Sequence, residues 1–348
     1  MLRSLSLKNF TVFAEADLKF ASGLNVIVGE NGAGKSHILK LAYTVAAVSA
    51  WGARDSGSAT PTKSYLEMAI ARKLRGVFRP DELGRLARRQ AGKSRCEVDV
   101  RFQPNSLRMG FSFNTSSRSE VSIDLLPTRW EGKPPAYLPT RELLSIYPGF
   151  LSLYETSELP FEETWKDICV LLGAPLARGP RLNEIRQLLE PLEEQLGGKV
   201  VLEDGRFYVR LEAGKMEAHL VAEGLRKLAM IARLIATGAL IGTGLLFWDE
   251  PEANLNPKVI KSVARTILQL CQAGVQVFVA SHSLFLMREL DILLKQDEFK
   301  TTEAQFFGLH PSADGVEVQQ GPTVDDIGEI DSLNEELTQS DRFLAAAA

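Results

Sequence analysis

A glycine-rich stretch at residues 29–36, with the sequence GENGAGKS, is the clearest candidate for chemistry in this chain. Its glycines let the backbone curl so that successive N–H groups and the start of a following helix face phosphate groups. An apolar run at residues 24–28 precedes it and a helical pattern follows it, which argues against an ordinary glycine-rich turn. Lys35 is then expected to reach the β and γ oxygens of a nucleoside triphosphate, and the Ser36 hydroxyl to ligate Mg²⁺. The predicted cradle consists of Asn31, Gly32, Ala33, Gly34, Lys35 and Ser36.

Two adjacent carboxylates end a second apolar run, at residues 244–250 with the sequence GLLFWDE. A strand buried on both faces reads as such a continuous run, and its carboxyl end opens into the crevice where α/β sheets bind ligands. We expect Asp249 to hold Mg²⁺ and Glu250 to polarise the attacking water. Neighbouring positions point to opposite sides of a strand, so the two side chains cannot do the same work. A simple helix N-cap is the alternative.

Two further segments follow the same logic of polar residues at the ends of elements. A third apolar strand is predicted at residues 275–280, and Ser281, His282 and Ser283 come directly after it. Ahead of the carboxylate pair, a short turn leads into a helix-like run at residues 228–235. The turn contains Ala222, Glu223 and Gly224. An ordinary loop histidine and an ordinary amphipathic helix start are the alternatives.

The order of these segments resembles the ABC-type ATPase core that transporter nucleotide-binding domains share with the SMC, RecF and OLD-like ATPases. The resemblance implies that the nucleotide is ATP and that residues 254–257 form the D-loop. It also implies that His282 contacts the γ-phosphate. In that family the signature turn, here Ala222, Glu223 and Gly224, caps the ATP bound by the other subunit. Ala222 stands where transporters have a serine.

The variant of the family is indicated by other segments. Residues 2–13 alternate apolar and polar side chains, as a half-buried strand does, and resemble the opening of RecF, SMC and OLD-like ATPases. Residues 137–142 are similar to a strand and loop of AAA-type 15 ATPases, and the Glu223-Gly224 pair resembles OLD-like and related AAA-type 15 or 21 ATPases. No glutamine stands where a Q-loop is expected, and residues 140–142 are predicted to take that region. The resemblance covers residues 1–45, about 137–143 and 215–310.

Composition favours an ordinary globular protein. The chain has 348 residues, of which 45% are hydrophobic and 24% charged. Cys96, Cys169 and Cys271 are too few and too widely spaced for a disulfide framework or a zinc site, which favours a reducing cytosol. No signal peptide is visible, and the apolar stretch at residues 228–246 is interrupted by Arg233 and by glycines. We therefore expect a soluble cytoplasmic protein without a membrane span.

Charge is uneven along the chain, although the formal net charge is only −4. A basic stretch at residues 72–95 could grip the phosphate backbone of DNA or RNA. It could equally be a solvated helical face or a docking surface for an acidic partner. The last residues, from Asp325 to Asp341, are acidic and are expected to form a flexible or partner-binding tail. The basic residues are Arg72, Lys73, Arg75, Arg79, Arg85, Arg88, Arg89, Lys93 and Arg95.

These patterns predict an α/β fold, a P-loop NTPase of the ABC-ATPase type with a mixed core sheet, an antiparallel β-lobe and an inserted helical region. We expect a single domain over residues 1–348, with the ATPase core at 1–45 and 215–310 and an acidic tail at 311–348. Residues 46–214 should hold the rest of the β-lobe and the helical insertion. Within them we expect a three-stranded meander at 97–125, a helix with an apolar stripe from Leu182 to Leu196, and a hairpin at 200–209. No long heptad run is present, which excludes a long SMC-type arm.

The resemblance implies a homodimer that encloses two ATP molecules and hydrolyses them with water oriented by Glu250. It further implies control of a separately encoded effector, such as a nuclease, in bacterial antiphage defence. A RecF-like ATPase for DNA repair or maintenance is the alternative. The energising subunit of a transporter, or a nucleotide switch that restrains a toxin, remain as further readings.

Overall fold

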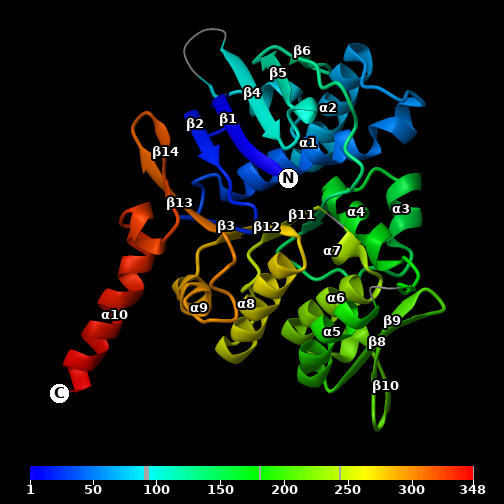
Figure 1. The fold of residues 1–348 in the computed structure, drawn as a ribbon, viewed down its shortest axis with the longest axis vertical. Coiled ribbons are helices and arrows are strands. Elements are labelled where there is room, and N and C mark those ends of the chain that lie inside the picture. Colours follow the sequence, from blue (N-terminus) through cyan, green and yellow to red (C-terminus); the bar gives the residue numbers. More distant parts are fainter. Residues whose placement is uncertain (90–93, 180–181, 243, 348) are drawn as a thin grey trace.

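A mixed six-stranded sheet forms the centre of the protein, in which a computed structural model describes residues 1–89, 94–179, 182–242 and 244–347. Five of its strands are parallel and β14 is antiparallel to β13 at one edge. The predicted mixed core sheet is therefore confirmed (Figure 1). In spatial order the strands are β14 (Gly315–Gly321), β13 (Ala304–Ser312), β3 (Leu24–Gly29), β12 (Gln276–Ser281), β11 (Leu245–Asp249) and β7 (Ala136–Leu138).

The central strands are covered on both faces, as their continuous apolar sequences predict. Every residue of β3, β11 and β12 is buried. Alternate side chains enter two different cores: Val26 packs with helices α6, α8 and α9, whereas Ile27 packs with α1 and α2. Because the strands are parallel, their carboxyl ends lie at one edge of the sheet, and the candidate site residues follow there.

A five-stranded antiparallel sheet lies over α1 and α2, on the side of the second core (Figure 1). It contains the predicted meander β4–β6, which is confirmed, and joins it to the N-terminal strands. The single strand expected at residues 2–13 is wrong in one respect: Asn9 and Thr11 have positive φ angles of 53° and 46°, so the chain turns back after Phe10. The strands, in order, are β2 (Phe13–Lys19), β1 (Leu2–Phe10), β4 (Arg95–Phe102), β5 (Met109–Asn114) and β6 (Ser122–Leu125).

Helices and a small three-stranded sheet make up the rest of the molecule. The predicted helix with the apolar stripe is confirmed as α5, which buries Ile185, Leu188 and Leu192 although Pro191 lies inside it. The predicted hairpin is confirmed as β8 and β9, whose turn residues Asp204 and Gly205 both have positive φ. The three strands are β8 (Gly198–Glu203), β9 (Arg206–Leu211) and β10 (Gly214–Glu217).

The helices begin and end where capping residues or glycines allow. Asn256 caps α8 by accepting a hydrogen bond from the Val259 N–H, with Pro257 at the first helical position. Ser283 caps α9 in the same way, through the Leu286 N–H. The helices are α1 (Lys35–Ser56), α2 (Lys63–Phe78), α3 (Phe150–Thr156), α4 (Glu163–Leu172), α5 (Leu182–Leu196), α6 (Glu223–Ala236), α7 (Ala239–Gly242), α8 (Pro257–Gln272), α9 (Leu284–Leu294) and α10 (Asp331–Ala347).

The C-terminal region continues the sheet before it leaves the body. Residue 311 lies inside β13, so the strands extend past the expected start of the acidic tail. β14 also reaches the antiparallel sheet, because the Gln320 amide donates to the Asp17 carbonyl and accepts from the Lys19 N–H. The acidic stretch that follows forms α10, which projects from the molecule (Figure 1). Phe343 and Leu344 on this helix are exposed.

A buried glutamine ties the two large sheets together. Gln276, the first residue of β12, is fully buried. Its Oε1 accepts from the Leu2 N–H at 2.8 Å, and its Nε2 donates to the Leu2 and Ala21 carbonyls, both at 2.7 Å. Gln276 therefore satisfies the backbone of β1 where that strand begins.

We expect Gln276→Leu to lower the free energy of unfolding by about 2–3 kcal/mol, because it leaves buried backbone groups without partners. Urea titration followed by circular dichroism would measure the change. Gln272→Leu is the matched control, since Gln272 is exposed at the end of α8 and should change stability by no more than about 0.5 kcal/mol. Equal effects of the two substitutions would contradict the role assigned to Gln276.

Candidate nucleotide-binding site

The glycine-rich loop has the local geometry of a phosphate cradle. It follows β3 directly and leads into α1, with Gly32 and Gly34 at positive φ angles of 85° and 91°. A Cβ atom on Gly34 would come within 2.7 Å of Val12 and 2.8 Å of Phe13, so the β1–β2 turn also requires a glycine there. Helix α1 begins with no side-chain cap and no acidic residue in its first turn. Its N-terminus therefore suits an anion.

Lys35 lies inside this loop. Its side-chain Nζ donates to the carbonyls of Gly29 at 2.8 Å and Glu30 at 3.0 Å, and the residue is only 6% exposed. Burial lowers the pKa of Lys35 below its ordinary value. The loop carbonyls thus hold the ammonium group in the position from which a lysine can reach phosphate oxygens, which fits a nucleotide.

Asp249, at the end of β11, faces the loop. Its Oδ1 accepts from the Ser36 hydroxyl at 3.0 Å, and its Oδ2 accepts from the Tyr137 hydroxyl at 3.1 Å. Burial raises the pKa of Asp249, against the effect of these two hydrogen bonds. A serine hydroxyl and a carboxylate oxygen are hard ligands of the kind that Mg²⁺ takes in nucleotide sites. The donor set therefore fits Mg²⁺, with Ser36 and Asp249 as the residues that would hold it.

Glu250 turns away from Asp249 and faces the end of β12. Its Oε1 lies 3.3 Å from His282 Nδ1. The structure thus brings together the two side chains that the sequence singled out for catalysis. Both remain reachable, since the side chains of Glu250 and His282 are 27% and 45% exposed.

A third acidic residue, Glu252, supports the loop that contains His282. Glu252 Oε1 accepts from the Ser281 hydroxyl at 2.7 Å and from the His282 backbone N–H at 3.3 Å, and it lies 4.0 Å from His282 Nδ1. The residue is 7% exposed, and its other oxygen is buried without a hydrogen-bond partner among the described residues. Glu252 was not predicted as a site residue. Its adjacency to the carboxylate pair is the signal that could have found it.

The turn after β11 is held by a lysine from α6. Lys227, 2% exposed, donates to the carbonyls of Glu250 at 2.7 Å and Ala253 at 3.3 Å. Burial lowers the pKa of Lys227 to about 8. Glu250 itself has a positive φ of 47°, a conformation that costs energy in a residue other than glycine. Lys227 therefore helps to fix the backbone that aims the Glu250 side chain.

The signature turn contacts the predicted D-loop. Ala222 is the N-cap position of α6, and the Asn254 amide donates to Glu223 Oε1 at 3.0 Å. A Cβ atom on Gly224 would come within 2.9 Å of the Asn254 carbonyl, which explains the glycine. Ala222 and Glu223 are exposed. The residues expected to cap a nucleotide in trans thus lie on the surface, while their support comes from residues 250–254 of the same chain.

Glu142 is the last residue of the segment that was expected to take the place of a Q-loop, and its side chain has a structural role. Glu142 is buried, and its Oε1 pairs with Arg226 Nε at 2.6 Å. Its Oε2 accepts from the backbone N–H groups of Leu144 and Ser145. Glu142 therefore anchors the first turn of α6 to the loop after β7.

The predicted basic segment separates into exposed and buried residues. Arg72, Arg75 and Arg79 are exposed at one face of α2 and line a cavity of about 440 Å³. The inclusion of Lys73 was wrong: it is buried, and its Nζ pairs with Asp167 Oδ2 at 2.6 Å and Glu163 Oε1 at 3.0 Å. Helical periodicity explains the difference, because Lys73 faces inward between the outward arginines.

The rest of that segment is less uniform. Arg95 lies in β4 and pairs with Asp124 and Glu97. Arg85 pairs with Asp81 at 4.0 Å. Lys93 lies outside the described residues. We therefore use the name arginine face for Arg72, Arg75 and Arg79 only.

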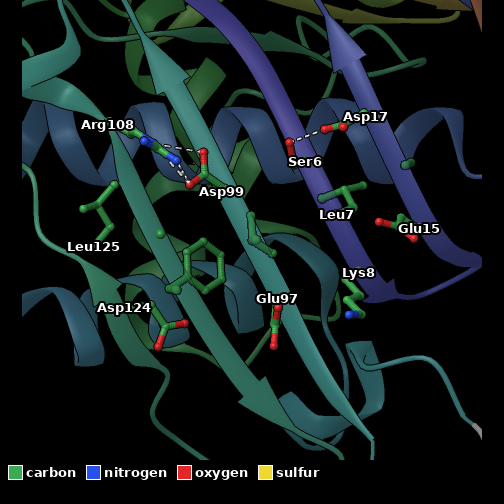
Figure 2. A pocket seen from close by; sticks show the side chains of 14 residues that line it. Ser6, Leu7, Lys8, Glu15, Asp17, Glu97, Asp99, Arg108, Asp124 and Leu125 are labelled. Atoms are coloured by element: carbon green, nitrogen blue, oxygen red, sulfur yellow. Dashed lines mark hydrogen bonds and ion pairs between the residues drawn. The ribbon is translucent and has the colours of Figure 1, made fainter.

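The outer face of the five-stranded sheet carries charges of both signs, several of them paired. Figure 2 shows carboxylates from β2, β4 and β6 around a cavity of about 540 Å³, with Arg108 turned onto Asp99 at 2.7 Å. The acidic residues lining this cavity are Glu15, Asp17, Glu97, Asp99 and Asp124.

Two protein-family models match the chain. Residues 132–288 match a family of AAA domains whose description names the AbiEii toxin and a type IV TA system, and residues 4–41 match a second family described as an AAA domain. A segment of 45 residues is 44% identical to the DNA replication and repair protein RecF of Streptococcus gordonii. That match covers 13% of this chain and 12% of RecF, so it spans only a small part of that relative.

Solved structures of SMC heads share the fold. An SMC head bound to the C-winged helix domain of ScpA is similar with a TM-score of 0.56 and 15% identity, over 93% of this chain and 98% of the other. An Smc head with an extended coiled coil, bound to the C-terminal domain of ScpA derived from Pyrococcus furiosus, gives 0.50 and 12%, over 98% and 99%. The expected resemblance and fold class are thus confirmed: two segments of the chain match AAA-domain family models, and the chain has the fold of an SMC head. Among its described residues no helix is long and apolar enough to cross a membrane.

The buried lysine leads to a pH prediction. The folded pKa of Lys227, about 8, lies below its ordinary value of 10.5, so the unfolded state binds more protons between these pH values and stability must rise with pH there. Between about pH 7.5 and 9.5 we expect the wild type to gain roughly 1–2 kcal/mol of unfolding free energy relative to Lys227→Met. Urea titrations of both proteins at the two pH values would measure it. A difference that does not change with pH would contradict a charged lysine held in this turn.

Proposed function

We propose that this AAA-type ATPase with the SMC-head fold binds ATP with Mg²⁺ and hydrolyses it to ADP and phosphate between two copies of the chain. The observation that carries the proposal is the convergence of Ser36 and Asp249 at 3.0 Å beside the glycine loop. Glu250 and His282 face each other at 3.3 Å on the neighbouring strand ends. A cradle, a metal-holding pair and a catalytic pair therefore lie along one edge of the sheet.

The side chains divide the work in a definite way. The N-terminus of α1 and the Lys35 ammonium bind the phosphates. Mg²⁺, when held by Ser36 and Asp249, supplies positive charge that offsets the charge of the β- and γ-phosphates. Glu250 orients and polarises the attacking water, and His282, held by the Glu252 carboxylate through its backbone, contacts the γ-phosphate. Positioning and electrostatics supply most of the catalysis in such reactions.

Each site is completed in trans in this proposal. Ala222, Glu223 and Gly224 of one copy close the nucleotide bound by the other, so ATP holds a head-to-tail homodimer together. The exposure of Ala222 and Glu223 supports this, because these residues are open to a partner and no side chain caps the first N–H groups of α6. Hydrolysis then releases the pair, and opening and closing are the output.

We assign that output to a separately encoded effector, such as a nuclease, in bacterial antiphage defence. The match to a family whose description names the AbiEii toxin and a type IV TA system supports a role in a two-component system. The SMC heads bound to ScpA domains show that this fold can carry a second protein. A cytoplasmic location is part of the proposal.

A RecF-like role on nucleic acid is the second candidate, favoured by the arginine face. Arg72, Arg75 and Arg79 have no ion pair recorded within the described chain, and they lie on the side of α2 that is open to solvent. Free guanidinium groups in a row suit a phosphate backbone. The RecF match, which lies in a segment of 45 residues, supports the same reading.

Two substitutions test the ATPase proposal together. We expect Lys35→Ala to weaken ATP binding by at least about tenfold, because it removes charge-assisted contacts to phosphate. Glu250→Gln should bind ATP normally but lower turnover by roughly 100-fold or more, since it removes the base. Fluorescent-nucleotide titration would measure ATP affinity, and phosphate release would measure turnover. Light scattering would give the mass and so the oligomeric state. Glu250→Gln should be a dimer with ATP and Mg²⁺, and a monomer in saturating ATP would contradict the proposal.

The arginine face gives a separate test. We expect the triple variant Arg72→Ala, Arg75→Ala, Arg79→Ala to bind a duplex DNA of about 30 base pairs more weakly and to reduce the slope of log affinity against log salt by about 2–3. Fluorescence anisotropy at several salt concentrations would measure it. Arg206→Ala, on the distant three-stranded sheet, is the control. If the wild type does not bind DNA, the RecF-like role is contradicted and the effector proposal is unaffected.

A further inference from the structure

Tyr137 is a buried polar residue that the proposed reaction does not yet use. It lies in β7, the edge strand beside β11, opposite Phe247 in the register, and is 2% exposed. Its hydroxyl donates to Asp249 Oδ2 at 3.1 Å, while Ser36 donates to Oδ1 at 3.0 Å. Burial, then the Asp249 charge, hold the pKa of Tyr137 well above its usual value, so the phenol stays a donor. The two oxygens of Asp249 are therefore fixed by different parts of the chain.

A second tyrosine continues this contact toward the helical lobe. The Tyr43 ring packs edge-on against Tyr137, with centroids 5.4 Å apart. The Tyr43 hydroxyl donates to Asp167 Oδ2 at 2.6 Å, and Asp167 also accepts from Lys73 at 2.6 Å. Asp167 belongs to α4, Lys73 to α2 and Tyr43 to α1. A chain of buried contacts thus runs from Asp249 to α4.

The start of α4 has another tie to the phosphate-loop helix. Lys40 lies one turn after Ser36 in α1 and pairs with Glu162, the N-cap position of α4. Burial raises the pKa of Asp249, and the charge of Lys40 opposes that rise. The helical lobe is therefore held to the nucleotide site by charged and hydrogen-bonded groups.

The sequence near β7 offers no glutamine that could connect Asp249 to the helical lobe. No glutamine occurs between Gln103 and Gln187, the interval that contains β7 and the loop after it. Glu142 in that loop is engaged by Arg226 and by backbone N–H groups. Tyr137 is the residue of β7 whose side chain directly contacts the metal-holding carboxylate.

We propose that Tyr137 is a positioning residue for Asp249, and that with Tyr43 it couples the metal-holding carboxylate to helix α4. The proposal rests on the proposed function, because it assigns Asp249 to Mg²⁺. In the free chain the Tyr137 hydroxyl holds Oδ2 and so directs Oδ1 toward Ser36. A partner that hydrogen-bonds a metal ligand typically changes metal affinity by about 10–100-fold when it is removed. Movement of α4 acts on the same carboxylate through the ring contact of the two tyrosines.

The test compares Tyr137→Phe with the matched variant Tyr43→Phe. Each removes one hydroxyl and keeps the ring. The probe is Mn²⁺, titrated into protein with a fluorescent ATP analogue and followed by electron paramagnetic resonance of the free ion. Nucleotide affinity in the presence of a chelator is measured beside it. We expect Tyr137→Phe to weaken Mn²⁺ binding by about tenfold and to leave metal-free nucleotide affinity unchanged.

Tyr43→Phe separates positioning from coupling. It should keep Mn²⁺ affinity within about twofold, because the Tyr137 hydroxyl remains on Asp249. Hydrogen exchange of residues 163–172 provides the second readout. In the wild type we expect metal and nucleotide to slow exchange in α4, and in both variants we expect that response to be lost.

The outcomes distinguish this proposal from the function on which it rests. A wild type that binds no nucleotide would overturn the proposed function, and the coupling with it. A wild type that binds nucleotide and Mn²⁺, with Tyr137→Phe equal to it in metal affinity, would overturn the positioning role alone. Unchanged exchange of α4 in every protein would overturn the coupling to the helical lobe.

Discussion

The position of Asp249 is the constraint on which the rest of the site depends. Its carboxylate is 7% exposed, and burying such a group is costly unless hydrogen bonds offset the loss of water. Ser36 and Tyr137 supply those bonds from opposite sides. Both donors arrive because β3 and β7 run parallel to β11 in one sheet, with Asp249 in register with Ala280 of the intervening β12. A slip of one residue in β11 would turn Asp249 to the opposite face and leave its donors unpaired.

The turn after Asp249 links the backbone of Glu250 to the start of α6. Glu250 and Asn254 both have positive φ angles, of 47° and 63°, which costs energy and must be supported by neighbours. Lys227 supports the first through the Glu250 carbonyl, and the Asn254 amide reaches Glu223. Glu250 and the turn at residues 222–224 are therefore parts of one hydrogen-bonded unit.

The sequence was sufficient for those parts of the fold in which neighbouring residues carry the information. Continuous apolar runs predicted β3, β11 and β12, and glycine, lysine and serine in order predicted the loop. The sequence alone did not predict contacts between segments that are far apart in the chain. Lys73 was assigned to the surface because charge alone does not show which side of a helix faces Asp167, 94 residues away. Lys227 and the Glu142–Arg226 pair were missed for the same reason, since each needs a partner that only folding brings near. Glu252 was missed although its adjacency to Asp249 and Glu250 was visible in the sequence.

The short strand β7 shows why a locally weak signal can matter most. It has three residues, lies at the edge of the sheet, and was predicted only from the resemblance of residues 137–142 to a strand and loop of AAA-type 15 ATPases. Yet Tyr137 within it holds Asp249, and Glu142 just beyond it holds Arg226 at the first turn of α6. Although β7 is paired on one side only, all three of its residues are buried, so packing holds it in the sheet. Two contacts of the candidate site, Tyr137 with Asp249 and Glu142 with Arg226, thus come from this strand and the loop after it, and neither partner is near in the sequence.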